Sequence, residues 1–467
     1  MDSNRYDAIV IGAGPSGLAA GIRLAQFEKR VVVLERHALC GGLNSYFKRG
    51  GRRFDTGLHA LTNFVPKGTK GAPLTKLLRQ LRIGYDELAL GEQGFSRICH
   101  AGLTLRFSNQ LGLLESEVAA AFPSQVDGFA RLLREVREFD AFDPRVAVTS
   151  ARAELGRFVT DPVLVEALLL PIAWYGSARE DDVDWYQFVI LFRSVFLEGF
   201  ARPEGGIKTL LDLLVARFRA CGGELRLRAP VQRIRLDAHG VARGVVLENG
   251  DELESDCVLS SAGGPETLAL AGRSIPPSDV GRLSFVETVH VTDRPCRALG
   301  HEATITFFND SPTFGWRRPD GLVDTRTGVI CSSDNYASAT PSTEGVLRIT
   351  TLANHDRWCE LDEESYAASK RACEAAVLEA AAAHAFDPRP HSIQSDTFTP
   401  RTIRHYTARS GGAVYGSPHK RRDGHSGIEN LFLIGTDQGL LGIVGALLSG
   451  VTMANQHALA STRGVAS

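Results

Sequence analysis

The residues best placed to do chemistry are three glycines near the start of the chain. They are Gly12, Gly14 and Gly17, with Pro15 and Ser16 between the last two. Glycine at the first position permits a tight turn, at the second lets the backbone approach a pyrophosphate, and at the third lets a helix pack closely on a sheet. The N–H groups and the dipole of a helix N-terminus also favour phosphate. The pattern predicts a dinucleotide-binding turn.

The neighbouring elements are those that position such a turn. Residues 6–11 predict a buried strand, the residues up to about Phe27 predict a helix, and Val31–Leu34 predict a second strand. Glu35 follows at once, where a carboxylate accepts both hydroxyls of an adenosine ribose. An acid at this position favours an unphosphorylated ribose, so we expect FAD or NAD rather than NADP.

A second glycine pair distinguishes FAD from NAD. Arg36 and the run Gly41-Gly42-Leu43-Asn44 come soon after the acid. This arrangement resembles the flavoprotein superfamily of amine oxidases and phytoene desaturases, in which the second turn lies along the FAD pyrophosphate and ribityl chain. The run Phe54-Asp55-Thr56-Gly57-Leu58-His59 is also similar to that family. The resemblance implies that Asp55 and Gly57 sit close to the flavin and that Leu58 and His59 are among the cofactor-binding residues.

The resemblance covers nearly the whole chain in the same order. It includes Pro203-Glu204-Gly205-Gly206, a strand that begins at Val231, a strand that leads to Gly263, and Tyr415-Gly416. It implies that the backbone at Val231 meets the adenine and that the strand leading to Gly263 carries the chain back past the cofactor.

The end of the chain is expected to return to the cofactor. Leu431–Gly435 predicts a buried strand, and a helix is predicted from the glycines that follow to about His457. The resemblance implies that this segment holds the ribityl chain and points a helix N-terminus at the flavin, where it stabilises negative charge on the reduced ring. The implied cofactor-binding residues are Gly435, Asp437, Gly442, Ile443, Val444 and Ala446. A plain helix cap is the alternative role for Asp437.

These motifs predict an α/β protein with a Rossmann-type, glutathione-reductase-like FAD-binding domain and an interleaved, mixed α+β substrate domain. We expect the FAD-binding domain to comprise residues 1–70, 203–265 and 401–467. The substrate domain would comprise residues 71–202 and 266–400. Its most apolar stretch, near residues 163–200, either forms a core or lines a tunnel that faces a membrane.

Composition excludes several classes of function. The chain has 467 residues, of which 43% are hydrophobic and 23% are charged, and its net charge of −2 gives no reason to expect nucleic acid. Its eight cysteines are scattered without metal-ligand spacing, so we expect no metal and free thiols in a reducing cytoplasm. With no secretory signal and no spanning segment in the sequence, we expect a cytoplasmic protein, with peripheral binding to a membrane surface as an open alternative.

Within the superfamily the chain is most similar to phytoene desaturases, carotenoid isomerases and retinol saturases. It departs from many of them at Leu43 and Asn44, where an arginine is common, and this leaves the exact reaction open. The resemblance implies hydride transfer between flavin N5 and a long lipophilic polyene or isoprenoid, with an unknown electron acceptor. His59 is the candidate proton acceptor, and a structural hydrogen bond is its alternative role.

Two other functions stay open from the sequence. One is an FAD-dependent amine oxidase or dehydrogenase that acts on a small or acyl-linked substrate. The other is a non-enzymatic scaffold that binds FAD. A long apolar tunnel would favour the polyene, whereas a water-accessible aromatic pocket would favour the amine.

Overall fold

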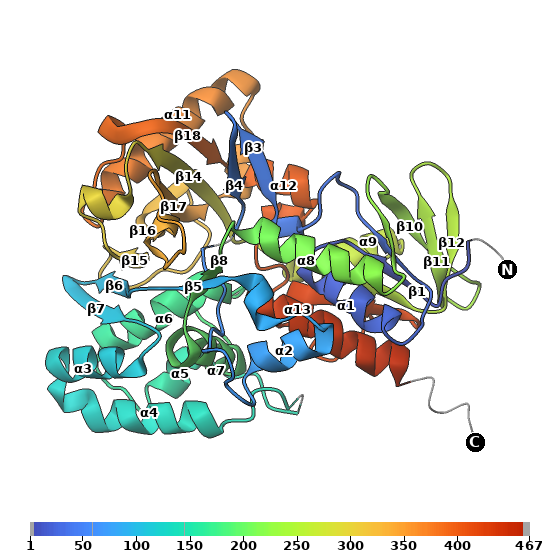
Figure 1. The fold of residues 1–467 in the computed structure, drawn as a ribbon, viewed down its shortest axis with the longest axis horizontal. Coiled ribbons are helices and arrows are strands. Elements are labelled where there is room, and N and C mark those ends of the chain that lie inside the picture. The colour runs from blue at the N-terminus through green and yellow to red at the C-terminus, as the bar shows by residue number, and fades with distance from the viewer. Residues whose placement is uncertain (1–3, 58, 144, 461–467) are drawn as a thin grey trace.

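A computed structural model describes residues 4–57, 59–143 and 145–460 of the chain. Two large sheets organise these residues, and helices cover their faces (Figure 1). The smaller sheet lies towards the two ends of the chain in this view, and the larger sheet lies on the opposite side.

The smaller sheet has five parallel strands in the order β19-β13-β1-β2-β9. The strands are β1 (Ala8–Ile11), β2 (Val31–Leu34), β9 (Glu224–Arg226), β13 (Val258–Ser260) and β19 (Leu431–Leu433). Because side chains alternate along a strand, Ala8 and Val10 face one side of the sheet, while Ile9 and Ile11 face the other. Both sets are buried, as is usual for parallel sheets with two covered faces.

Helices cover one face of this sheet and a small antiparallel sheet covers the other (Figure 1). The helices are α1 (Pro15–Ala25), α2 (Pro73–Leu81), α8 (Ile207–Ala220) and α13 (Gly442–Met453). On the other side lie β10 (Val231–Leu236), β11 (Ala242–Leu247), β12 (Glu252–Glu254) and α9 (Gly264–Leu270). The order β1, α1, β2 with parallel pairing confirms the predicted Rossmann-type fold.

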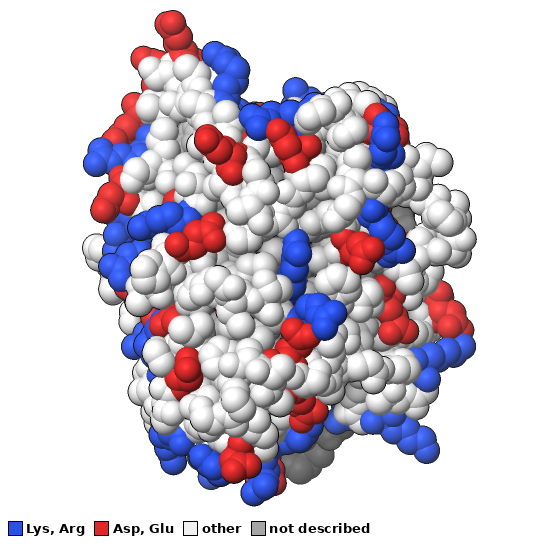
Figure 2. Space-filling model, turned by 90° about the vertical axis from the view of Figure 1, so that its left-hand side faces the viewer, with Lys and Arg blue, Asp and Glu red and all other residues white. Residues whose placement is uncertain are grey.

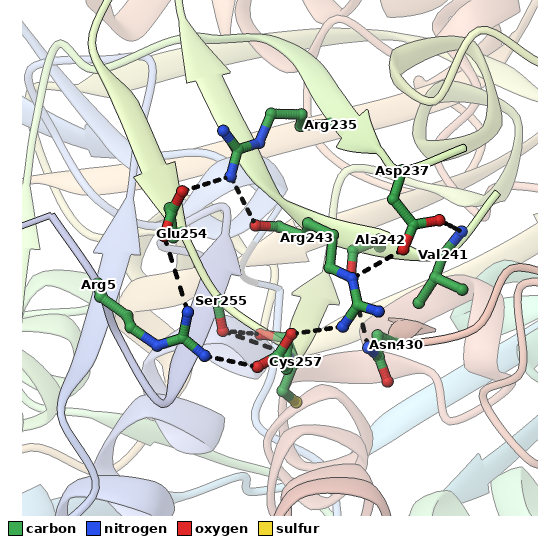
Figure 3. Close-up of polar contacts among 11 residues, drawn as sticks. Arg5, Arg235, Asp237, Val241, Ala242, Arg243, Glu254, Ser255, Cys257 and Asn430 are labelled. Atoms are coloured by element: carbon green, nitrogen blue, oxygen red, sulfur yellow. Dashed lines mark hydrogen bonds and ion pairs between the residues drawn. The ribbon is translucent and has the colours of Figure 1, made fainter. Parts of the chain in front are cut away.

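Ion pairs connect the small antiparallel sheet to the start of the chain (Figure 3). Arg5 donates to Asp256 at 2.8 Å, and Arg243 donates to the same carboxylate at 2.7 Å. Arg235 donates to Glu254, also at 2.8 Å. Exposed pairs of this kind contribute at most about 1 kcal/mol each, so buried apolar side chains contribute most to holding these strands.

The larger sheet has seven strands in the order β18-β14-β17-β16-β15-β6-β7. They are β6 (Ser96–His100), β7 (Leu103–Phe107), β14 (Ser284–Thr292), β15 (Ile305–Asn309), β16 (Val323–Ser332), β17 (Gly345–Ala353) and β18 (Ser392–Phe398). Helix α11 (Glu363–Ala381) packs on one face. Because β6 and β7 precede α8 and the other strands follow it, two distant chain segments build this sheet.

A helical layer covers the other face of the larger sheet (Figure 1). It consists of α3 (Leu111–Ala121), α4 (Val126–Glu138), α5 (Ala151–Leu155), α6 (Pro162–Gly176) and α7 (Trp185–Phe192). Phe188, Phe192 and Phe196 are at most 1% exposed, so these side chains of the apolar stretch pack in the interior. Among the described residues, no helix has the length and apolar character needed to cross a membrane.

Short elements join the two halves. The hairpin β3 (Tyr46–Arg49) and β4 (Arg52–Asp55) leads out of the smaller sheet, and β5 (Leu90–Glu92) pairs with β8 (Ala201–Pro203) between the sheets. Helices α10 (His355–Cys359) and α12 (Pro400–Thr407) complete the fold. The strands of the smaller sheet come from three separated segments, and the exact domain boundaries given above stay a prediction.

Charged side chains of both signs are intermixed on the face shown in Figure 2. This distribution agrees with the small net charge of the chain.

A close helix contact gives a test of the fold. A Cβ atom at Gly450 in α13 would lie 2.0 Å from the carbonyl oxygen of Ser16 in α1. We therefore expect Gly450→Ala to force the helices apart and to lower the free energy of unfolding by about 1–3 kcal/mol. Gly112→Ala in α3 is the matched control, because a Cβ there meets nothing within 4 Å and alanine favours a helix. Chemical denaturation measures both, and equal stabilities would contradict the packing described.

Candidate functional site

The first glycine turn leaves its backbone open to a ligand. Gly12 has a φ of +95°, which favours glycine, and a Cβ at Gly17 would lie 1.9 Å from the carbonyl oxygen of Gly12. Gly14 is different: a Cβ there would meet nothing closer than 3.7 Å, and the residue is partly exposed. Two of the glycines therefore serve the fold, while Gly14 leaves space before the N-terminus of α1, which begins at Pro15.

The second glycine turn lies against the first. The Gly41 amide donates to the carbonyl oxygen of Ala13 at 3.0 Å, and a Cβ at Gly42 would lie 3.9 Å from Cα of Gly14. Leu43 and the neighbouring Asn44 are partly exposed. The two turns together form an accessible strip of backbone at the carboxyl ends of the parallel strands, where such folds bind ligands.

Glu35 occupies the expected position at the end of β2. Its carboxylate accepts from the backbone amides of Ala13 and His37, both at 2.9 Å, and the residue is 6% exposed. The amide of Ala229 donates to its carbonyl oxygen at 2.8 Å, which brings the start of β10, where Val231 lies, next to the acid. Arg36, by contrast, is exposed.

The C-terminal segment completes this strip. The Gly435 amide donates to Ser449 Oγ at 2.7 Å, and a Cβ at Gly435 would lie 2.8 Å from Ser16 Oγ. Helix α13 begins at Gly442, where a Cβ would lie 3.7 Å from Thr62 Oγ1. Of the other predicted residues on this helix, Ile443 and Val444 are buried and Ala446 is partly exposed. The structure thus brings α1, both glycine turns and the N-terminus of α13 together.

Asp437 and Gly263 lie deeper than the strip. The Asp437 carboxylate accepts from the backbone amides of Gly264 and Ser417 and from Arg409 at 3.2 Å. Burial raises its pKa, but Arg409 and Lys420 outweigh that effect and hold the pKa below its usual value. A Cβ at Gly263 would lie 2.1 Å from Glu266 Oε2. Since protein groups occupy the Asp437 carboxylate, its contact with the ribityl chain stays a prediction.

His59 lies beside the strip. A Cβ at Gly57 would lie 2.7 Å from the carbonyl oxygen of Leu43, so this segment packs on the second glycine turn. Leu58, also predicted to contact the cofactor, lies outside the described residues. Tyr336 OH donates to the carbonyl oxygen of His59 at 3.0 Å, and Cys331 Sγ lies 3.6 Å from the same oxygen. The backbone at His59 is thereby fixed to the larger sheet.

The His59 ring lies next to a charged pair, Glu287 and Arg348, that the sequence did not predict. His59 Nε2 lies 3.1 Å from Glu287 Oε2 and 3.2 Å from Thr350 Oγ1. Arg348 Nε donates to Glu287 Oε1 at 2.9 Å, and its Nη2 donates to the carbonyl oxygen of Asp55 at 2.6 Å. The sequence held a signal, because Glu287 is the one acidic residue of β14, a strand that is buried along its whole length.

Electrostatics keep Glu287 ionised. Burial by itself would raise the pKa of this carboxyl, but the charge of Arg348 and the hydrogen bond to His59 outweigh it and lower the pKa to about 2. Asp55, at the other side of Arg348, pairs with Arg202 and accepts from the Ile207 amide at 3.2 Å. The strip therefore borders a buried, fully paired group of charges.

Aromatic side chains fill the space between the larger sheet and the helical layer near His59. They form two groups of ring contacts with centroids 5.0 to 6.3 Å apart: one contains Trp174, Phe285, Trp316 and Tyr415, and the other contains Tyr175 and Phe307. We call them the aromatic wall; its members are Trp174, Tyr175, Phe285, Phe307, Trp316 and Tyr415. Tyr175 has a buried hydroxyl with no hydrogen-bond partner among the described residues.

Comparison with known families decides the assignment of the strip. The family model described as flavin containing amine oxidoreductase matches residues 15–456. The chain belongs to this family. The family membership confirms FAD as the cofactor, and the geometry agrees, because the strip offers glycine backbone, a helix N-terminus and a ribose-binding acid in the required order.

Curated relatives are similar over most of their length. A chloroplastic prolycopene isomerase of Arabidopsis thaliana is 24% identical, over 94% of this chain and 76% of the relative. An all-trans-retinol 13,14-reductase of Danio rerio is 22% identical, over 96% of this chain and 85% of the relative. Both matches agree with the predicted resemblance to carotenoid isomerases and retinol saturases.

Solved structures share the fold. An oxidoreductase from Methanosarcina mazei has a TM-score of 0.66 at 16% identity, with 95% of this chain and 99% of the other covered. A triple mutant of putrescine oxidase has a TM-score of 0.63 at 18% identity, with 98% and 99% covered. At these identities the likeness concerns the fold alone.

Within the described ranges, no group of three or more His, Cys, Asp or Glu side chains could hold a metal ion. The eight cysteines are free thiols.

The different roles of the glycines give a test of FAD binding. At Gly14 the protein tolerates a Cβ, but the pyrophosphate would meet it, so we expect Gly14→Ala to keep the unfolding temperature of the apoprotein and to weaken FAD binding by about tenfold or more. Quenching of flavin fluorescence during titration of apoprotein measures the affinity. Gly17→Ala is the contrasting variant and should lower stability, because its Cβ meets the Gly12 carbonyl. Unchanged FAD affinity in Gly14→Ala would place the pyrophosphate elsewhere.

Proposed function

We propose that this protein is an FAD-dependent oxidoreductase of the carotenoid desaturase and isomerase type, which acts on a long lipophilic polyene or isoprenoid. When bound, FAD supplies the acceptor or the donor of a hydride for such a substrate. The observation that carries the proposal is the aromatic wall, whose Tyr175 lies close to Tyr336 and Cys331, the two residues that contact the carbonyl oxygen of His59. A polyene offers only apolar surface and π-electrons, and rings of this kind bind both.

The relatives' names support the same substrate class. One is named a prolycopene isomerase and the other an all-trans-retinol 13,14-reductase. A small amine would call for an aromatic pocket that water can reach. Four rings of the aromatic wall are instead at most 8% exposed: Trp174, Phe285, Phe307 and Trp316.

In this proposal the protein's own groups bind, orient and remove a proton. The two glycine turns and Glu35 hold the cofactor, the aromatic wall orients the substrate and excludes water, and His59 accepts the proton. The division into an FAD-binding and a substrate domain, with the boundaries given above, belongs to the same proposal. Lipophilic substrate would be delivered from a membrane surface.

Anaerobic incubation of the FAD-loaded protein with a polyene in liposomes tests the proposal. Bleaching of oxidised flavin with formation of a more conjugated product indicates a desaturase. A product that forms only when the flavin is first reduced indicates an isomerase or a saturase. Reduction of the flavin by amines, with no change in any polyene, would overturn the proposal in favour of an amine oxidase. No change with any of these donors would favour a scaffold.

The orphaned hydroxyl of Tyr175 gives a second test. A polyene makes no hydrogen bond to it, so we expect Tyr175→Phe to retain turnover and to raise the free energy of unfolding by about 1 kcal/mol, because a buried unsatisfied group is removed. Tyr336→Phe is the matched control. We expect it to lower the free energy of unfolding by about 1 kcal/mol, since the hydroxyl that is removed donates to the carbonyl oxygen of His59. Loss of turnover in a stable Tyr175→Phe protein would show that the hydroxyl binds a polar group of the substrate.

A further inference from the structure

The two oxygens of the Glu287 carboxylate have different hydrogen-bond partners. Oε1 accepts both hydrogen bonds from Arg348, one of them at 2.9 Å from Nε. Oε2 faces the other way and accepts from Thr350 Oγ1 at 2.8 Å. His59 Nε2 lies 3.1 Å from the same Oε2. One oxygen therefore anchors the carboxylate, and the other is directed at the imidazole.

The charge state of this carboxylate determines which nitrogen of the imidazole carries the proton. An ionised carboxylate only accepts hydrogen bonds, so His59 Nε2 must be the donor. The Thr350 hydroxyl already donates its hydrogen bond to Glu287, so it acts as an acceptor towards His59 Nε2. In the neutral imidazole the other nitrogen, Nδ1, then carries a lone pair.

Nδ1 is the nitrogen left for chemistry. Among the described residues it has no hydrogen-bond partner. The His59 side chain keeps 21% of its surface exposed, against 2% for Glu287. Gly57, two residues earlier, packs on the second glycine turn, and Tyr336 and Cys331 fix the carbonyl oxygen of His59. The imidazole is thus fixed on one edge and accessible on the other.

We propose that Glu287 is the positioning residue of the reaction: it holds His59 in the Nε2–H tautomer, so that Nδ1 takes the proton. This inference rests on the proposed function. A desaturation removes a hydride and a proton from adjacent carbons of the substrate. Oxidised FAD, when bound, would supply the hydride acceptor; His59 Nδ1 takes the proton, and the electron pair of that broken C–H bond becomes the new double bond. The resulting imidazolium is neutralised by Glu287.

Replacing the Glu287 carboxylate by an amide is expected to change the tautomer of His59. In Glu287→Gln the amide oxygen must stay on Arg348, because a guanidinium only donates. The amide NH₂ then faces His59 Nε2 and donates to it, so the imidazole proton moves to Nδ1 and the lone pair is lost from the accessible edge. An amide in place of the carboxylate of a catalytic triad acts in the same way, through the wrong tautomer.

Nitrogen NMR of protein labelled with ¹⁵N-histidine reads the tautomer directly, without substrate. His59→Gln identifies the His59 signals among the 13 histidines. We expect a protonated Nε2 in the native protein, with and without FAD, and a protonated Nδ1 in Glu287→Gln. A native protein with Nδ1 protonated would overturn the inference, whatever the substrate is.

Kinetics then test whether Glu287 acts through His59. We expect polyene turnover to fall about 100-fold or more in His59→Gln and in Glu287→Gln, and the double variant to fall no further than either one. Independent, multiplying losses would overturn the positioning role. Undiminished turnover in a folded Glu287→Gln protein would do the same while leaving the proposed function intact. If the native protein transforms no polyene, the proposed function fails, and the tautomer measurement still stands.

A second glutamate–histidine pair provides the control. Glu374 on α11 lies 3.4 Å from His290 Nε2 and accepts from Thr397 at 3.1 Å. Since His290 and Glu287 are three positions apart on β14, they point to opposite faces of the sheet. We expect Glu374→Gln to change neither the His59 tautomer nor turnover. Should Glu287→Gln fail to fold because Arg348 loses its charged partner, the native tautomer and His59→Gln decide the question.

Discussion

The structure depends on a close approach of backbones at the start of α1. The carbonyl of Gly12 leaves no room for a side chain at Gly17, and the carbonyl of Ser16 leaves none at Gly450. Because α1 can therefore lie directly on β1 and on α13, segments from both ends of the chain meet at one point. The N-terminus of α1, the second glycine turn and the N-terminus of α13 form the strip there. A longer side chain at any of these contacts would separate the parts that hold the cofactor.

The second constraint is the burial of charge between the two sheets. Asp55, Arg348 and Glu287 are almost completely buried, Arg202 is partly exposed, and the four are paired with one another. A buried ion pair is costly to desolvate and is strongly destabilising when one partner is removed, so it is weak evidence for stability by itself. Its geometry is informative, however, because the chain of contacts ends at the accessible ring of His59. The fold thereby places one ionised carboxylate behind one imidazole, next to the strip.

The two constraints explain why the site combines polar and apolar walls. On the strip, glycine backbone and helix N-termini favour phosphate and an anionic flavin. Aromatic rings from α6, β14 and β15 lie in the interior between the larger sheet and the helical layer. Family membership accounts for the first wall, and the second is the basis of the proposed polyene. The cofactor can then supply the redox step while the protein supplies orientation and a proton acceptor.

The sequence by itself determined the cofactor-binding unit. Gly12, Gly14, Gly17 and Glu35 act within one strand–helix–strand unit, so local spacing was enough to predict a dinucleotide-binding fold. The choice of FAD came from the second glycine pair and the family resemblance that it carries. The tertiary structure alone decided the surroundings of His59. Glu287 and Arg348 are 61 residues apart, and each is more than 220 residues from His59. No local pattern joins them; antiparallel pairing of β14 with β17 puts both side chains on one face of the sheet. Asp437 makes the same point, because its carboxylate is held by residues brought in from three other segments.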